Sequence, residues 1–228
     1  MGTPVRGVIL AGGKGTRLGE LTRVTNKHLL PIGEFPMVYH PLKKMVGAGI
    51  TDILLVSGTE HMGDFVELFG SGKDFGCRLT YRVQDEAGGI AQALGLAELF
   101  CKDARSVVIL GDNIFADPLK NFVSLTNSRP LDAAVMIKQV PDPGRYGVAE
   151  LSSGRILSIE EKPKQPKSDW AVAGIYSYPP DVFEVIRTLK PSGRGELEIT
   201  DVNNHYVKAG RLVSWEMSGY WTDAGTLS

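Results

Sequence analysis

Short apolar runs alternate with segments of helical periodicity through the first half of the chain. The apolar runs lie at residues 5–10, 53–56, 79–83 and 106–110. The first two runs predict buried strands, because a strand covered on both faces shows no polar alternation, and the other two predict a third and a fourth strand. Helical spacing of apolar residues predicts helices over residues 36–48, 65–69 and 90–100. Parallel strands require crossover helices, so this order predicts an α/β fold with a mostly parallel sheet and helices on both faces.

The pattern changes after Pro130, where strand-like segments follow one another with only turn residues between them. These segments lie at residues 133–140, 146–151, 156–161 and 172–178. Direct succession favours antiparallel pairing. Two more helices, at 182–189 and about 198–209, precede a last strand at 212–215. No flexible linker interrupts the chain, so we expect a single domain over residues 1–228, with a β-rich second half that extends the same sheet and lines the other side of a cleft.

Composition and charge exclude several classes of protein. The 228 residues are 43% hydrophobic and 22% charged, as in ordinary globular domains. Lys plus Arg number 25 against 26 for Asp plus Glu, so there is no net charge to attract nucleic acid or a membrane surface. The amino terminus shows no secretory signal, which predicts a cytoplasmic protein. Cys77 and Cys101 are far apart, which predicts free thiols instead of a disulfide or a zinc site.

A glycine-rich loop follows the first predicted strand and is the strongest local signal of chemistry. Residues 10–18 read LAGGKGTRL. Glycines allow backbone N–H groups to approach phosphate oxygens, and Arg17 adds a planar donor. The spacing matches neither a Walker A loop nor the G-x-G-x-x-G dinucleotide motif. The alternative is a tight structural turn, but its place after the first strand favours a site for a polyanion.

Several charged residues stand where they could serve the same polyanion. Lys27 lies in NKHLLP (26–31), and its alternative is a solvated surface charge. Asp112 follows a predicted strand in LGDN (110–113) and could bind magnesium, which prefers few carboxylates plus phosphate oxygens. Alternatively, Asp112 is a cap or turn residue. EEKP (160–163) and Tyr146-Gly147 could recognise hydroxyls and a phosphate, or be solvated strand ends. Asp223, between Trp221 and a glycine, offers a second aspartate.

Eight motifs in one order resemble the sugar-phosphate nucleotidyltransferases over essentially the whole chain. They are LAGGKGTRL (10–18), NKHLLP (26–31), QDEAGGIAQA (84–93), LGDN (110–113), RYGV (145–148), EEKP (160–163), GELEITDVN (195–203) and WTDAGT (221–226). The resemblance implies a Rossmann-like nucleotidyltransferase fold, with a nucleotide-binding half at about 1–130 and a sugar-phosphate-binding half at about 131–228. It also implies a cytoplasmic enzyme that converts dTTP and glucose 1-phosphate to dTDP-glucose and pyrophosphate with Mg²⁺.

The same resemblance assigns roles to individual residues. The nucleotide contacts it implies are Leu10, Ala11, Gly12, Gly13, Gly15, Thr16, Arg17, Gln84, Gly89 and Asp112. The sugar-phosphate contacts it implies are Asn113, Tyr146, Gly147, Glu161, Lys162, Val172 and Gly174. The implied catalytic cations are Arg17, Lys27 and Lys162, and the implied magnesium ligands are Asp112 and Asp223. Gln84 could offer both a donor and an acceptor to a pyrimidine base.

Departures from the family pattern leave alternatives open. Residues 85–88, Asp-Glu-Ala-Gly, replace a proline-containing turn, so UTP or another triphosphate with another hexose 1-phosphate is the closest alternative. A non-catalytic nucleotide-sugar-binding regulatory subunit is the alternative from another class. The chain ends at Ser228, where long family members continue into a helical extension, so the feedback regulation of those members is not expected. A homo-oligomer is compatible with the resemblance.

Overall fold

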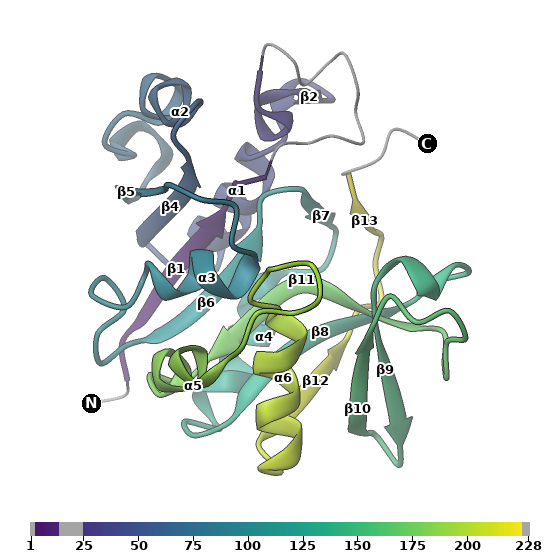
Figure 1. Ribbon diagram of the computed structural model, residues 1–228. Coiled ribbons are helices and arrows are strands. Elements are labelled where there is room, and N and C mark those ends of the chain that lie inside the picture. Colours follow the sequence, from purple (N-terminus) through teal and green to yellow (C-terminus); the bar gives the residue numbers. More distant parts are fainter. Residues whose placement is uncertain (1–2, 14–24, 225–228) are drawn as a thin grey trace.

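A nine-stranded mixed sheet forms the centre of the molecule in the computed structural model, which describes residues 3–13 and 25–224 (Figure 1). Its continuous strand order is β10-β9-β11-β6-β1-β4-β5, and β8 pairs with β11 and β12. The strands of the first half are β1 (Val5–Leu10), β4 (Asp52–Gly58), β5 (Arg78–Gln84) and β6 (Arg105–Leu110). These four strands are parallel to one another. The predicted α/β fold and the four predicted strands are confirmed. Strands β1, β4 and β6 are largely buried, whereas β5 lies at the edge of the sheet and contains no buried residue.

The second half adds five strands to the same sheet. They are β8 (Ala133–Gln139), β9 (Gly147–Ser152), β10 (Arg155–Glu161), β11 (Trp170–Tyr178) and β12 (Leu212–Glu216). Strand β11 is antiparallel to β6, β8 and β9, and β9 is antiparallel to β10. Strand β12, however, is parallel to β8. It enters the sheet only after two helices, and this long connection permits the parallel direction that direct succession would not.

Strand β11 changes its partner along its length, and this change opens the sheet beside the cleft described below. Residues 175–178 pair with β6, whereas Ala171 pairs with Val148 of β9. The pairing of β11 with β8 shifts register between Val172 and Tyr176. Strand β9 therefore replaces β6 beside β11 beyond the point where β6 ends.

Helices cover both faces of the sheet and create two cores. One core contains residues from α3 (Ile90–Gly95), α5 (Val182–Thr188) and α6 (Ile199–Lys208). The other contains residues from α1 (Tyr39–Gly47), α2 (Met62–Phe69) and α4 (Leu119–Asn127). Within β1, Val8 and Leu10 join the first core while Ile9 joins the second. This alternation explains why the strand carries no polar face. Helix α3 ends at Gly95, earlier than predicted, and α4 was not predicted.

Two short antiparallel pairs lie outside the main sheet. Strand β7 (Asn113–Phe115) follows β6 closely and pairs with β13 (Trp221–Asp223), so that Asp223 lies opposite Asn113. Strands β2 (Pro31–Ile32) and β3 (Phe35–Pro36) form the other pair. None of the helices in the described ranges is long and apolar enough to span a lipid bilayer.

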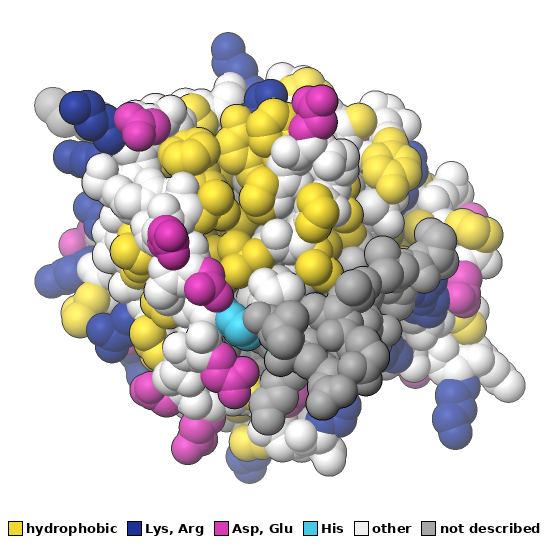
Figure 2. All heavy atoms as spheres, turned by 90° about the horizontal axis from the view of Figure 1, so that it is seen from above, with side chains coloured by type: hydrophobic (Ala, Val, Ile, Leu, Met, Phe, Trp, Pro, Cys, Tyr) yellow, Lys and Arg dark blue, Asp and Glu magenta, His cyan; other side chains and the backbone are white. Residues whose placement is uncertain are grey.

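The end of the molecule that carries β3, α1 and α2 has an apolar surface. Figure 2 shows hydrophobic side chains gathered on this end. The Phe35 ring stacks on Tyr39 at 4.6 Å between centroids, and Phe75 contacts both Tyr39 and Phe69 edge-on. Phe35 remains 42% exposed. These ring contacts join β3 to α1 and α2 and so close one side of the sheet.

Candidate active site

A cleft of about 380 Å³ lies at the carboxyl ends of β1 and β6, between the two halves of the chain. Most of the residues that the sequence singled out line it: Leu10, Gly12, Gly13, Lys27, Gln84, Gly89, Asp112, Asn113, Tyr146, Gly147, Glu161, Lys162, Val172, Gly174 and Asp223. Ala11 does not, because its side chain is buried in the core beneath. Gly15, Thr16 and Arg17 lie outside the described residues. The position agrees with the general preference of parallel sheets for ligands at their carboxyl edge.

Backbone contacts hold the start of the glycine-rich loop. The Ala11 N–H donates to the Val56 carbonyl at 2.8 Å, and the Ala11 carbonyl accepts from Ser57 Oγ at 3.0 Å. A Cβ at position 12 would lie 3.0 Å from Gln84 Oε1, so only glycine fits there comfortably. Gly13 has a φ of +101°, a conformation that favours glycine. The loop therefore leaves the sheet in a shape that other residues would not readily adopt.

Lys27 and Asp112 form an ion pair inside the cleft. Asn26 caps the short helical turn that carries Lys27, because its Oδ1 accepts from the His28 N–H at 2.9 Å. Lys27 Nζ donates to Asp112 Oδ2, and the two side chains are only 15% and 14% exposed. Burial alone would raise the pKa of Asp112, but the Lys27 charge, His28 and hydrogen bonds from Lys27 and Asn113 together hold that pKa below its usual range. Asp112 is therefore ionised at neutral pH.

His28 lies in the wall of the cleft and was not predicted to belong to the site. Burial lowers the pKa of His28 to about 3, against a smaller upward effect of Asp112. The imidazole is therefore neutral, and its Nδ1 donates to Asn26 Oδ1 at 2.6 Å, since a carboxamide oxygen only accepts. A Cβ at Gly111 would lie 2.7 Å from His28 Cδ2, so the glycine before Asp112 makes room for this ring.

Asn113 joins three strands at the base of the cleft. Its Oδ1 accepts from the Gly174 N–H in β11 and from Trp221 Nε1 in β13, each at 2.8 Å. Its Nδ2 donates to Asp112 Oδ1 at 3.0 Å. The backbone adds a further link, because the Ala224 N–H donates to the Asp112 carbonyl at 2.9 Å. Asp112, in the turn before β7, and Asp223, at the end of β13, are therefore held near each other although they are remote in the sequence.

The two carboxylates define the kind of metal that the cleft could hold. Within residues 3–13 and 25–224 there is no cluster of three or more histidine, cysteine or acidic side chains suited to a metal ion. A closed structural site would need such a cluster. Two carboxylates, one of them ionised and fixed by Asn113, fit Mg²⁺, which takes its remaining ligands from phosphate oxygens and water.

The second half of the chain supplies a cation and a carboxylate to the opposite wall. Lys162 has a φ of +45°, and its N–H donates to the Tyr146 carbonyl at 2.9 Å. A left-handed lysine costs about 1 kcal/mol and persists where the surroundings determine it. Glu161 Oε2 accepts from Thr200 Oγ1 at 2.7 Å, which fixes that carboxylate beside Gly147. Lys162 and Glu161 thus face the cleft from the end of β10.

The turn at Gly88 and Gly89 is locked against a loop from the second half. The Leu197 backbone bonds to both sides of the turn: its N–H donates to the Gly88 carbonyl at 2.8 Å, and its carbonyl accepts from the Ala91 N–H at 3.1 Å. Gly89 has a φ of +98°, and a Cβ there would lie 2.5 Å from the Leu197 oxygen. A side chain at position 89 would break this contact. The turn therefore requires glycine at position 89.

Several residues that line the cleft had received no role from sequence reasoning. They are His28, Arg145, Tyr176, Arg194, Glu198, Thr200 and Trp221. Burial raises the pKa of Tyr176, and the charges of Glu161, Asp112 and Asp223 raise it further, which places its hydroxyl among the acidic groups of the site. Arg194 donates to both carboxylate oxygens of Glu198 at 2.9 Å. Most of these residues lie in motifs of the family resemblance, which was the available signal.

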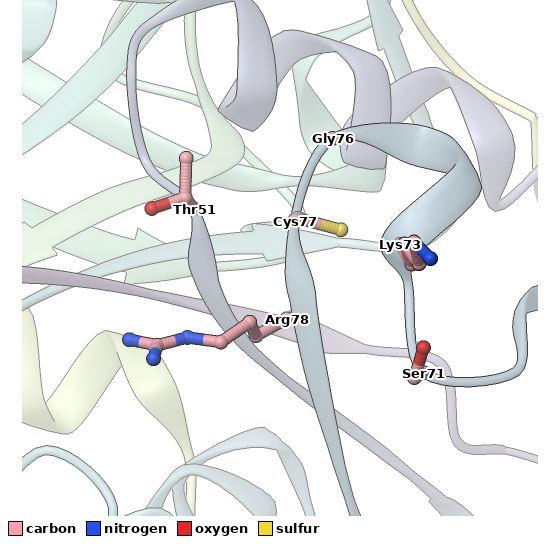
Figure 3. A pocket seen from close by; sticks show the side chains of 6 residues that line it. All are labelled: Thr51, Ser71, Lys73, Gly76, Cys77 and Arg78. Atoms are coloured by element: carbon pink, nitrogen blue, oxygen red, sulfur yellow. The ribbon is translucent and has the colours of Figure 1, made fainter.

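A second cavity, of about 320 Å³, lies where β4 and β5 begin (Figure 3). Six residues line it: Thr51, Ser71, Lys73, Gly76, Cys77 and Arg78. The Arg78 guanidinium is already paired with Asp52 at 2.7 and 2.8 Å. Cys77 Sγ donates to the Gly72 carbonyl, and burial raises the pKa of its thiol. This amino-terminal edge of the sheet contains none of the predicted site residues.

Comparisons with known proteins agree with the site. Residues 6–228 match the nucleotidyl transferase family model. Glucose-1-phosphate thymidylyltransferase from Neisseria gonorrhoeae is 45% identical over 231 residues, which cover 97% of this chain and 78% of that protein. A Bacillus anthracis structure in complex with sucrose, provisionally named a glucose-1-phosphate thymidylyltransferase, is 57% identical with a TM-score of 0.94 and covers 97% of this chain and 90% of its own.

A more distant structure extends the comparison to another nucleotide. UDP-glucose pyrophosphorylase complexed with UDP-glucose is 25% identical with a TM-score of 0.85, covering 98% of this chain and 94% of that one. The match of the family model over nearly the whole chain and the relatives above 40% identity bear out the resemblance of the eight sequence motifs. The chain belongs to the nucleotidyl transferase family.

Proposed function

We propose that this chain is a glucose-1-phosphate thymidylyltransferase, which converts dTTP and glucose 1-phosphate to dTDP-glucose and pyrophosphate. The observation that carries the proposal is the convergence, in one cleft, of the loop at Gly12 and Gly13, the Lys27–Asp112 pair, Asp223 and the opposite wall at Lys162. The names of relatives that are 41–45% identical support dTTP and glucose 1-phosphate as the substrates.

The reaction is a displacement at phosphorus, and the residues of the cleft suit it. An oxygen of the sugar phosphate attacks the α-phosphorus of the triphosphate, the bond to the bridging oxygen breaks, and pyrophosphate leaves on the opposite side. Alignment and charge neutralisation are the main catalytic requirements. The N–H groups at Gly12 and Gly13 and the Lys27 ammonium would bind the triphosphate. Arg17, outside the described residues, would stabilise the leaving pyrophosphate.

The sugar phosphate would bind at the opposite wall. Arg145, Lys162 and Arg194 are the cations that the second half of the chain brings to the cleft, and any of them can neutralise the attacking phosphate. Glu161, held by Thr200, would accept hydrogen bonds from sugar hydroxyls. Tyr146, Gly147, Val172 and Gly174 would surround the sugar ring. Asn113 would contribute mainly by holding Asp112 and the backbone of β11 in place.

Asp112 and Asp223 would hold Mg²⁺ together with phosphate oxygens. When bound, Mg²⁺ supplies a positive charge that neutralises the polyphosphate in the transition state. Asp112 is suited to the role because it is ionised and fixed by Asn113. We place the reaction in the cytoplasm, where nucleoside triphosphates and sugar phosphates are available. The homo-oligomer and the division into two functional halves stay predictions.

A second candidate is the same reaction with UTP. The fold similarity to a UDP-glucose pyrophosphorylase bound to UDP-glucose favours it, since thymine and uracil present the same hydrogen-bonding edge. A non-catalytic regulatory subunit is the less favoured alternative, because the cleft retains the two aspartates and both Lys27 and Lys162.

The experiment that tests the proposal measures pyrophosphate release from glucose 1-phosphate, Mg²⁺ and each of dTTP, UTP, CTP and GTP. We expect the highest kcat/KM with dTTP. Asp112→Asn and Asp223→Asn should each lower kcat at least ~100-fold, because a lost carboxylate ligand removes several kcal/mol of transition-state stabilisation. Asp64→Asn, on the exposed side of α2, is the control and should leave kcat unchanged. Absence of pyrophosphate with every nucleotide, or full activity of both cleft variants, would refute the proposal.

A further inference from the structure

Gln84 and Gln92 face each other across the turn that begins one wall of the cleft. Gln84 is the last residue of β5, and Gln92 lies in the first turn of α3. Gln84 Nε2 donates to Gln92 Oε1 at 2.7 Å. Of these two glutamines, Gln84 was expected from the sequence to contact a nucleotide base, with an amide that could act as donor or acceptor. The contact with Gln92 removes part of that freedom.

Backbone groups determine which way both amides point. The Gly88 N–H is shared between the Glu86 carbonyl at 2.9 Å and Gln92 Oε1 at 3.0 Å. Because an N–H only donates, the Gln92 atom that faces it is the oxygen. The atom of Gln84 that faces this oxygen must then be the nitrogen. A second backbone group agrees, because the Gly89 carbonyl lies 3.4 Å from Gln84 Nε2. A Cβ at Gly88 would lie 2.2 Å from Gln92 Cδ, so glycine at position 88 admits this close approach.

The carboxamide oxygen of Gln84 is consequently left to the cleft. Both N–H groups of Nε2 are directed to protein acceptors, at Gln92 and Gly89. The Oε1 atom lies on the other side, near Gly12 at the start of the glycine-rich loop. No donor from the described part of the chain bonds to it. A base beside this loop would therefore meet an acceptor, and no donor, from the Gln84 side chain.

We propose that Gln92 is a positioning residue that fixes Gln84 as a hydrogen-bond acceptor and thereby selects a pyrimidine with an N–H at position 3, thymine or uracil, over cytosine. The inference rests on the proposed function and deepens it. The N3 atom of cytosine is an acceptor, so it would oppose the Gln84 oxygen. Reversing the Gln84 amide would relieve that opposition but would direct its oxygen at two other acceptors, Gln92 Oε1 and the Gly89 carbonyl.

Two substitutions of Gln92 separate positioning from a merely structural role. Gln92→Met keeps an unbranched side chain of similar length without an acceptor oxygen, whereas Gln92→Glu retains oxygens that accept from Gly88 and Gln84. The assay measures kcat/KM with dTTP, dUTP and dCTP against glucose 1-phosphate. We expect wild type to prefer dTTP over dCTP by at least ~100-fold, Gln92→Met to reduce that ratio ~10-fold or more, and Gln92→Glu to preserve it. The dTTP to dUTP ratio should stay constant in all three proteins.

Each outcome decides for or against the inference. An unchanged dTTP to dCTP ratio in Gln92→Met, or an equal loss with both nucleotides, would overturn it. Wild type with N3-methyl-dTTP provides a measurement that needs no variant: it should lose at least ~100-fold in kcat/KM, and near-normal turnover would also refute the inference. If wild type turned over no pyrimidine triphosphate at all, the proposed function itself would fail, whereas an active enzyme with an unresponsive ratio would reject only the role of Gln92.

Discussion

Replacing Gly174 with alanine should disturb both the stability of the fold and the carboxylates of the cleft. A Cβ at this position would lie 2.6 Å from Asn113 Nδ2 and 2.7 Å from Leu110 Cδ1. Both neighbours are buried or nearly so, and Asn113 is held by hydrogen bonds to Gly174, Trp221 and Asp112. Ordinary contacts need about 3.4 Å or more, so the Asn113 amide would have to move by about 0.8 Å.

The magnitude follows from two contributions. Overpacking of a buried site destabilises by about 1–3 kcal/mol. Displacing Asn113 also weakens its bond from the buried Trp221 Nε1, and an unsatisfied buried donor costs about 1–3 kcal/mol. We expect a loss of about 3 kcal/mol in unfolding free energy, which for a chain of this size corresponds to a Tm lower by about 6–12 °C. Because Asn113 also orients Asp112, kcat/KM should fall ~100-fold.

Thermal denaturation and pyrophosphate release measure the two effects, and two variants serve as controls. Gly47→Ala places a Cβ in α1 with no atom within 4 Å, so it should leave activity unchanged and stabilise by up to ~1 kcal/mol. The double variant Asn113→Ala with Gly174→Ala removes the contacted amide but keeps the contact with Leu110, so Gly174→Ala should cost less unfolding free energy in the Asn113→Ala background than in wild type. A Gly174→Ala protein that melts within ~1 °C of wild type, or strictly additive single effects, would refute the reasoning.

Three further predictions concern buried ionisable groups. Lys27→Met leaves the Asp112 carboxylate without its cation, so the unfolding free energy of the variant should lie about 3 kcal/mol below that of wild type at pH 8. The difference should be smaller at pH 5, where the carboxyl can protonate. Equal differences at the two pH values, measured by chemical denaturation, would contradict this. His28 has a pKa of about 3 in the fold and 6.5 ordinarily, so the unfolding free energy falls as the pH drops through that interval, by about 2 kcal/mol at pH 5. Unfolding free energies measured in urea at several pH values should depend less steeply on pH in His28→Gln. Arg105 is 2% exposed and donates to four oxygens, so Arg105→Met should cost about 3 kcal/mol, against less than ~1 kcal/mol for the exposed Arg78→Met control.

Most regular elements could be predicted from the sequence because apolar runs and helical spacing report burial directly. The buried strands β1, β4 and β6 are examples. Helix α4 also has the periodicity, with Leu119, Phe122, Val123 and Thr126 buried on one side, but it was not predicted. It is short, and its Asn, Ser and Thr residues have weak helix propensity. The parallel pairing of β12 with β8 was not predictable in this way, since local succession contains no information on where a strand re-enters the sheet after two helices.

Many of the residues that line the cleft could be predicted from the sequence, but their contacts with one another could not. The order of motifs indicated Lys27 and Asp112, but their ion pair joins residues 85 positions apart and depends on how β6 and the turn at Lys27 meet. The role of Gln92 was hidden for a different reason. Its side chain has the polarity of an ordinary helix residue, and only the Gly88 N–H reveals which amide atom it presents to Gln84.

The position of Asn113 explains why fold and chemistry cannot be separated in this cleft. Strand β6 ends at Leu110, and β9 takes its place beside β11, so the sheet has no regular ladder at that point. The Asn113 side chain supplies the missing connection, accepting from β11 and β13 with one oxygen. Its amide nitrogen donates to Asp112 at the same time. A substitution that weakens the junction therefore also moves a proposed magnesium ligand, which is why loss of stability and loss of activity should appear together in Asn113 and Gly174 variants.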